Sequence, residues 1–167
     1  MQAFKHPSSA GLALVLSAAL AGPAGAQTAP TAPAATAPAA LHPALKAAAA
    51  EPGAVVTASG LVFRQLEAGQ GATPAATDVV RVHYRGTFTD GREFDSSYSR
   101  NQPASFALNR VIPCWTEGLQ LMKPGGSARL TCPPDLAYGE RGAGNGLIPP
   151  GSVLVFEVKL LGVTPAP

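Results

Sequence analysis

Between residues 60 and 163, apolar and polar residues alternate in short runs that predict an antiparallel sheet. The runs are 60–69, 78–88, 105–108, 127–132 and 152–163. In 78–88, Val80, Val82 and Tyr84 fall on one face, and Arg81 and His83 fall on the other. A period of two is typical of a strand with one buried face. The runs at 127–132 and 152–163 alternate in the same way, so several strands should share one apolar face.

One stretch has the spacing of a helix. Pro113 suits a first helical position, and Trp115, Leu119 and Met122 form a single apolar stripe. The helix should end near residue 123, before "PGG" at 124–126. Asp90-Gly91 also marks a hairpin turn after the strand at 78–88. These elements predict an α+β fold, in which a twisted antiparallel β-sheet wraps around one short α-helix.

The N-terminal region differs from this core. Lys5 is followed by a 13-residue apolar run at 10–22 and by "AGA" at 24–26, which is the pattern of a Sec-type signal peptide over 1–26. A membrane anchor is the alternative, but the run is too short to span a bilayer. We therefore expect export to the periplasm or secretion, without stable membrane insertion after cleavage.

Residues 27–52 are rich in Ala, Pro and Thr and predict a disordered linker. Within it, 41–50 has helix propensity but is too short for a stable isolated helix. It could form a transient helix or dock on the domain. The folded domain is expected over 53–163, with a disordered tail at 164–167.

Composition excludes several functions. Without Lys5, eleven of the twelve basic residues remain against ten acidic ones, and no basic run is present, so nucleic acid is not an expected partner. "GERGAGNG" at 139–146 suggests a phosphate loop, but "IPPG" follows it where such a loop requires a helix.

The sequence also lacks the residues that a hydrolase or a metal site requires. Ser96-Ser97 have no evident base, and His83 reads as a solvated strand residue. Asp90, Glu93 and Asp95 are close in sequence, yet no His or Cys joins them, so we expect no metal and no cofactor.

Aromatic side chains remain as candidates. Several lie where strands meet loops, and Tyr138 introduces the Gly/Pro-rich loop up to Gly151. They could simply pack the core, or they could line a binding site, because loops on a rigid scaffold commonly carry binding residues.

Three motifs resemble the FKBP-type peptidyl-prolyl cis/trans isomerases, and the bacterial secreted or periplasmic members in particular. They are "VHYRGTFTDGREFDSSYSRNQP" (82–103), "VIPCW" (111–115) and "AYG…GLIPPGSVLVFEVKLL" (137–161). The resemblance implies a proline-binding pocket with Trp115 as its floor. It implies Asp95 and Tyr138 as catalytic residues, and as substrate-binding residues Tyr84, Phe94, Asp95, Arg100, Phe106, Val111, Ile112, Trp115, Tyr138, Leu147, Ile148 and Phe156.

The resemblance also implies roles for these residues. The backbone N–H of Ile112 and the hydroxyl of Tyr138 would bind ligand carbonyls, and Leu147 and Ile148 would belong to a mobile flap. The activity implied is acceleration of Xaa-Pro isomerisation while exported proteins fold. A non-catalytic chaperone or adaptor using the same pocket is the alternative, and a partner-specific surface factor is another.

The implied partners are proline-containing unfolded or partly folded polypeptides, and macrolides such as tacrolimus. A monomer is expected. The chain departs from the family pattern at Ala104, where many relatives have an aromatic residue, and at Asn109-Arg110, where the loop before the helix is compressed. Cys114 beside Trp115 and the longer flap differ too. The departures bear on macrolide affinity and on sequence preference more than on activity.

Cys114 and Cys132 could form a disulfide. Alternation places Cys132 on the core face, beneath the predicted helix that carries Cys114, and an exported protein meets oxidising conditions. Two buried free thiols are the alternative, because free cysteine packs well in protein cores. A further difficulty for the disulfide is that Cys114 lies about 100° around the helix from Trp115, so the two side chains cannot both point at the same partner.

Overall fold

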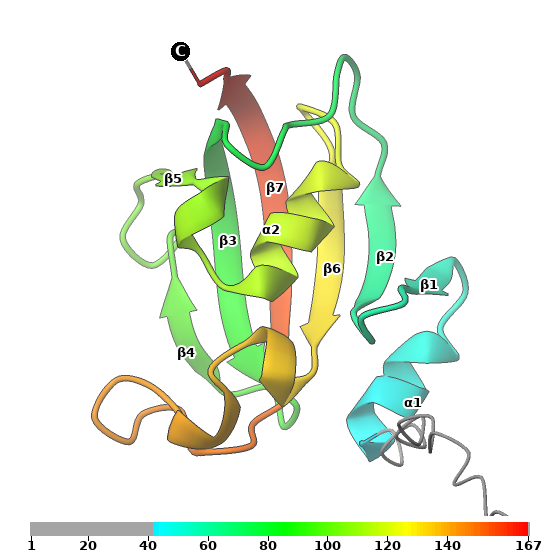
Figure 1. The fold of residues 1–167 in the computed structure, drawn as a ribbon, viewed down its shortest axis with the longest axis vertical. Helices are drawn as coiled ribbons and strands as arrows, with labels where there is room; N and C mark the ends of the chain where they lie inside the picture. Colours follow the sequence, from blue (N-terminus) through cyan, green and yellow to red (C-terminus); the bar gives the residue numbers. More distant parts are fainter. Residues whose placement is uncertain (1–41, 167) are drawn as a thin grey trace, which may run out of the picture. The chain divides into compact units, whose positions relative to one another are not determined.

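The strands pair into one antiparallel sheet of seven strands in this computed structural model, which describes residues 42–166 (Figure 1). The order is β1-β2-β6-β7-β3-β4, and β5 also pairs with β3. The strands are β1 (Ala54–Val56), β2 (Val62–Glu67), β3 (Val79–Phe88), β4 (Glu93–Ser96), β5 (Ala104–Ala107), β6 (Ser127–Cys132) and β7 (Leu154–Thr164). The predicted fold class is confirmed. The predicted signal peptide at 1–26 and the predicted linker up to residue 41 lie outside the described residues.

The α-helix α2 (Pro113–Gln120) crosses one face of the sheet (Figure 1). It packs against the apolar side chains of β3, β6 and β7. Gly118 permits this contact, because a Cβ there would lie 2.7 Å from Leu130 Cδ2. The helix ends three residues earlier than predicted. Lys123 precedes Pro124, and the residue before a proline is disfavoured in helical conformation. Met122 is nevertheless buried against the core, as the apolar stripe predicted.

A second helix covers part of the opposite face of the sheet. This helix, α1 (Pro43–Ala49), buries Leu45 against Val62 and Val153. Thr131, predicted on a polar face, is buried as well. Of the two possibilities open for 41–50, the structure shows docking, so ordered structure begins before residue 53. Burial of Leu45 supplies stabilisation that so short a helix lacks in isolation.

The rest of the opposite face is charged. Arg64 and Arg129 are neighbours on β2 and β6, and Glu51 forms ion pairs with both. Arg129 also pairs with Glu157 on β7 at 2.8 Å. Apolar residues on one face and paired charges on the other fix which way each strand faces, because a slip of one residue would exchange the two sets.

The C-terminal strand is longer than expected. β7 includes Thr164, which pairs with Val79, and the N–H of Ala166 donates to Asp78 Oδ1 at 3.1 Å. The expected disordered tail is therefore wrong at its start. Pairing with the long strand β3 satisfies backbone groups that a free tail would leave to water.

Three short 3-10 helices complete the described structure: η1 (Leu108–Arg110), η2 (Pro134–Leu136) and η3 (Gly139–Arg141). The first leads into α2, and the other two open the Gly/Pro-rich segment between β6 and β7 (Figure 1). Among residues 42–166 we find no helix with the length and apolarity to cross a bilayer.

Candidate functional site

A cavity of about 330 Å³ lies between the sheet and the N-terminal end of α2. It brings together side chains from four strands, from the start of α2, from the segment directly before α2 and from the loop between β6 and β7. Its lining residues are Tyr84, Phe94, Asp95, Phe106, Arg110, Val111, Ile112, Trp115, Tyr138 and Phe156. Nine of these ten were predicted as site residues, although they span more than seventy positions of sequence.

Aromatic rings in edge-to-face contact build the walls and the floor of the cavity. Trp115 lies at the centre, with ring centroids 5.1 Å from Tyr84, 5.5 Å from Phe106 and 5.4 Å from Phe156. Phe94 extends the series through Phe156 at 5.6 Å. Such perpendicular pairs are favourable for aromatic quadrupoles and resist collapse into the cavity. The aromatic residues therefore pack the core and line a site at once.

Gly86 on β3 makes room for this arrangement. A Cβ at Gly86 would lie 2.6 Å from Phe94 Cζ and 3.1 Å from Phe156 Cε1. The two rings can therefore meet directly above the strand backbone only because residue 86 has no side chain.

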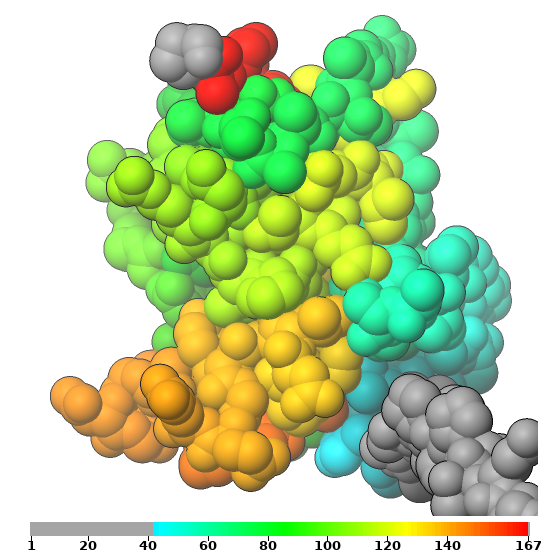
Figure 2. Space-filling view, viewed as in Figure 1, coloured from blue at the N-terminus to red at the C-terminus, as the bar shows by residue number. Residues whose placement is uncertain are grey.

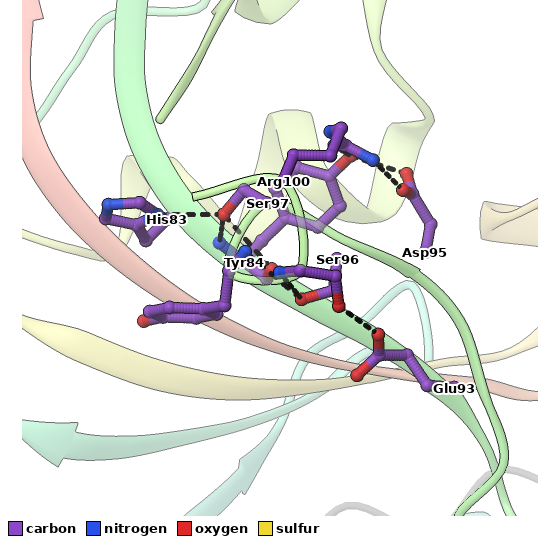
Figure 3. Close-up of polar contacts among 9 residues, drawn as sticks. His83, Tyr84, Glu93, Asp95, Ser96, Ser97 and Arg100 are labelled. Carbon is purple, nitrogen blue, oxygen red and sulfur yellow. Dashed lines mark hydrogen bonds and ion pairs between the residues drawn. The ribbon is translucent and has the colours of Figure 1, made fainter. Parts of the chain in front are cut away.

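Asp95 at the edge of the cavity is held on both oxygens (Figure 3). The Tyr84 hydroxyl donates to Oδ2 at 2.5 Å, and Arg100 Nη1 donates to Oδ1 at 2.5 Å. Arg100 Nη2 also donates to the Tyr84 oxygen at 2.8 Å. Arg100 itself is exposed and does not line the cavity, so it acts on the site through Asp95 and Tyr84.

This cluster sets the ionisation of both acidic groups. Partial burial favours the neutral form of Asp95, but the hydrogen bonds from Tyr84 and Arg100 and the Arg100 charge outweigh it, so the pKa of Asp95 lies below its ordinary value. Burial, followed by the hydrogen bond to Asp95, raises the pKa of Tyr84. At neutral pH the site thus contains a carboxylate and a neutral phenol.

Ser97 anchors the turn that carries this cluster (Figure 3). Its fully buried hydroxyl accepts from the Tyr84 N–H at 2.8 Å, and its own N–H donates to the Tyr84 carbonyl at 2.9 Å. His83 Nδ1 lies 2.9 Å from the same hydroxyl, and its ring stacks on Tyr98. A base does lie beside Ser97, contrary to the sequence prediction, but a hydroxyl without solvent access cannot attack a substrate.

The neighbouring carboxylates have separate partners. Asp90 pairs with Arg92 at 2.7 Å, and Glu93 pairs with Arg85 at 2.9 Å, while Asp95 pairs with Arg100. The three acidic residues that are close in sequence thus point to different cations and form no common site.

The two residues directly before α2 contribute side chains and one backbone N–H donor to the cavity. Val111 and Ile112 both line the cavity. The Ile112 carbonyl accepts from the N–H groups of Trp115 and Thr116, whereas the Ile112 N–H has no acceptor among residues 42–166. An N–H donor without a partner beside an apolar cavity can bind a carbonyl of a ligand.

The flap is only partly where the resemblance implied. Tyr138 lines the cavity, and partial burial, with the nearby Asp95 charge, raises its pKa. Ala143 and Ile148 exchange two hydrogen bonds of 3.0 Å, which close a hairpin whose tip contains Asn145 at φ 53°. In the space-filling view this orange segment projects from the surface (Figure 2).

The two flap residues expected at the pocket lie elsewhere. Leu147 is 56 % exposed at the hairpin tip, and Ile148 is buried in the core. Neither lines the cavity. Because side chains alternate in direction along the hairpin, one points to solvent and the next points inward to the core.

Cys114 and Cys132 form a disulfide with a Cα–Cα distance of 5.8 Å, and both are fully buried. Cys114 and Trp115 do not need to point at the same partner, because they lie on different sides of α2. Cys114 faces β6, while Trp115, about 100° further round, faces the cavity. The bond ties the residue next to the cavity floor to the C-terminal end of β6.

Arg110 lines the cavity although no sequence reasoning placed it there. The only signal was its position directly before Val111, in the compressed loop ahead of the helix.

Comparison with known proteins gives a consistent result. Residues 70–161, more than half of the chain, match a family described as FKBP-type peptidyl-prolyl cis-trans isomerase. The FKBP-type isomerase FkpA of Escherichia coli (strain K12) is 52% identical over 71% of the chain and 43% of its own length. The FKBP-type 22 kDa isomerase of the same organism is 59% identical over 63% of the chain and 50% of its own length.

Solved structures agree with the sequence relatives. A crystal structure of a peptidyl-prolyl cis-trans isomerase from Pseudomonas syringae pv. tomato superposes with a TM-score of 0.68 at 41% identity, covering 73% of this chain and 89% of that one. The chain spans half or less of the length of the two curated relatives above. On the match over 70–161, the chain belongs to the FKBP-type peptidyl-prolyl cis-trans isomerase family.

Proposed function

We propose that the protein is a peptidyl-prolyl cis/trans isomerase that accelerates Xaa-Pro isomerisation in exported polypeptides. The observation that carries the proposal is the 330 Å³ aromatic cavity, which has Trp115 at its centre and Asp95 and Tyr138 at its edge. A proline ring is an apolar group that fits such a cavity, and the neighbouring carbonyls need donors.

The chemistry requires no nucleophile and no cofactor. The barrier of about 18–20 kcal/mol comes from the double-bond character of the C–N bond. Water stabilises the charge-separated planar amide through its carbonyl oxygen. An apolar cavity removes that water and binds the twisted, less polar amide better, which is preferential binding of the transition state.

Polar groups at the edge of the cavity orient the substrate. The Ile112 N–H would donate to one substrate carbonyl, and the neutral Tyr138 hydroxyl would donate to another. Asp95, fixed by Arg100 and Tyr84, would supply an oriented negative charge near the amide. Phe94, Phe106 and Phe156 would hold the proline ring, and Leu147 at the exposed flap tip would contact the polypeptide outside the cavity.

The proposed setting is the periplasm or the extracellular space. The signal-peptide pattern at 1–26 supports export, and the Cys114–Cys132 disulfide suits an oxidising compartment. We propose a monomer whose clients are unfolded or partly folded proline-containing chains, with macrolides of the tacrolimus class as competing ligands.

A protease-coupled assay on a panel of Xaa-Pro peptides tests the proposal. The mature chain should accelerate the slow step, which takes tens to hundreds of seconds without catalyst. Tyr138→Phe should lose on the order of 1 kcal/mol of transition-state stabilisation, which is about fivefold in kcat/KM. Isomerisation no faster than in buffer alone, for every peptide, would refute the proposed enzymatic activity.

The alternative is an adaptor that binds through the same cavity without catalysis. Proline peptides that bind but are not isomerised faster would favour it. Tyr138→Phe and wild type would then differ in affinity alone, or not at all.

A further inference from the structure

Arg110 is the one residue of the cavity lining that the family resemblance did not imply. It is exposed and ends η1, directly before Val111 and Ile112, whose side chains line the cavity with it. Its guanidinium is a permanent cation with five N–H donors. A substrate chain seated on the aromatic floor must therefore pass this cation.

The backbone that carries Arg110 is held firmly. Leu108, two residues earlier, is fully buried, and its N–H donates to the Asp78 carbonyl at 3.0 Å. The Leu108 carbonyl in turn accepts from the Thr116 hydroxyl at 2.6 Å. The loop is thus attached both to the strand side and to α2, so the side chain of Arg110 starts from a defined point at the cavity rim.

No carboxylate among residues 42–166 pairs with this cation. Arg110 forms no ion pair in the part of the chain that the structure describes. Asp95 is the one acidic residue in the cavity lining, and Tyr84 and Arg100 occupy its two oxygens. Glu117 on α2 accepts from Ser59 at 2.6 Å and lines a different groove.

We propose that Arg110 is a specificity residue that favours Xaa-Pro substrates with an Asp or Glu side chain beside the Xaa-Pro pair. The inference rests on the proposed isomerase function. A guanidinium matches a carboxylate in charge and in fork geometry, and it repels Lys or Arg at the same place.

The size of the preference for acidic substrates follows from the solvent exposure of Arg110. An ion pair at a solvent-exposed rim is weak, so kcat/KM should rise about two- to fivefold for an acidic substrate at low salt. At 1 M salt the Debye length falls to about 3 Å, and most of the preference should vanish.

The experiment compares peptides that differ at a single position. Glu, Gln or Lys is placed either directly before or directly after a constant Xaa-Pro pair, and kcat/KM is measured in about 20 mM and 1 M salt. The readout is the Glu-to-Gln ratio for each position. Wild type should show a ratio above two at one of the two positions in low salt.

Charge variants of the protein identify the residue responsible. Arg110→Gln should bring the ratio close to one, and Arg110→Glu should reverse the preference towards Lys. The control is Arg81→Glu, an equal change of net charge at an exposed residue on the opposite face of β3. It should retain the wild-type ratio and its salt dependence.

The outcomes separate the two proposals. Isomerisation of neutral peptides with a Glu-to-Gln ratio of one at both positions overturns the role of Arg110 and leaves the isomerase intact. A ratio that survives both Arg110 variants, or that Arg81→Glu removes equally, also overturns it. Absence of acceleration for every peptide refutes the isomerase itself.

Discussion

Replacing Gly86 by alanine tests the packing that shapes the cavity. Gly86 lies on β3 under the contact between Phe94 and Phe156, and its φ is not in the left-handed region, so alanine introduces no backbone strain. The whole effect must come from the added methyl group. A methyl carbon would lie 2.6 Å from Phe94 Cζ and 2.8 Å from Cε2, whereas carbon atoms normally meet at about 3.5–4.0 Å.

The magnitude follows from two opposing effects. Overpacking a core costs about 1–3 kcal/mol. Alanine in place of glycine within a strand recovers about 0.5–1 kcal/mol of backbone entropy. Taking the middle of each range, the expected net loss is about 1 kcal/mol in the free energy of unfolding. Phe94 lines the cavity, so a shift of its ring changes the shape of the cavity, and kcat/KM should fall by roughly tenfold.

Urea unfolding and the peptide isomerase assay measure the two effects. Gly162→Ala is the matched control, since Gly162 is also on a strand but a Cβ there meets nothing within 4 Å. It should be neutral or slightly stabilising and fully active. In a Phe94→Leu background the methyl at 86 should cost at least about 1 kcal/mol less, because the clashing ring is gone.

Specific results would refute this reasoning. If Gly86→Ala is as stable and as active as Gly162→Ala, the two rings do not depend on the missing side chain. If the loss of stability is the same with and without the Phe94 ring, the cost arises from another contact.

Three further changes have defined outcomes. Asp95→Asn should have a lower free energy of unfolding than wild type at neutral pH. Because the folded-state pKa of Asp95 is lowered, the difference in unfolding free energy should shrink as the pH falls from about 4 through that pKa. A difference that stays constant in acid would contradict the ion cluster. Changing both Cys114 and Cys132 to alanine removes a cross-link between residues 18 positions apart and should lower the free energy of unfolding by about 3 kcal/mol. Thiol titration of denatured, unreduced wild type from an oxidising compartment should find no free thiol. Leu45→Ala should lower the free energy of unfolding in urea by about 2 kcal/mol, because Leu45 is buried between α1 and the sheet. Leu66→Ala, at an exposed residue, should stay within about 0.5 kcal/mol of wild type, and equal effects would mean that the helix is not docked.

Local patterns were enough to predict the sheet and its inner face. Val80, Val82 and Leu130 are all fully buried, as their alternation indicated. Side chains on a strand must point in alternate directions, so a repeated apolar-polar order identifies the inner face without reference to any partner strand. The site aromatics were also predictable, but through resemblance to a family, since alternation alone could not distinguish core packing from binding.

Contacts between distant segments decided the rest. The docking of α1 depends on Val153, more than a hundred residues from Leu45, and a short helix carries no sign of that partner. Leu147 is exposed and Ile148 is buried because of the hairpin that closes between Ala143 and Ile148. Arg110 became part of the cavity because Leu108 and Thr116 hold its loop. Amphipathic periodicity is a property of neighbours in the chain, whereas burial of a loop residue is set by whatever the fold brings against it.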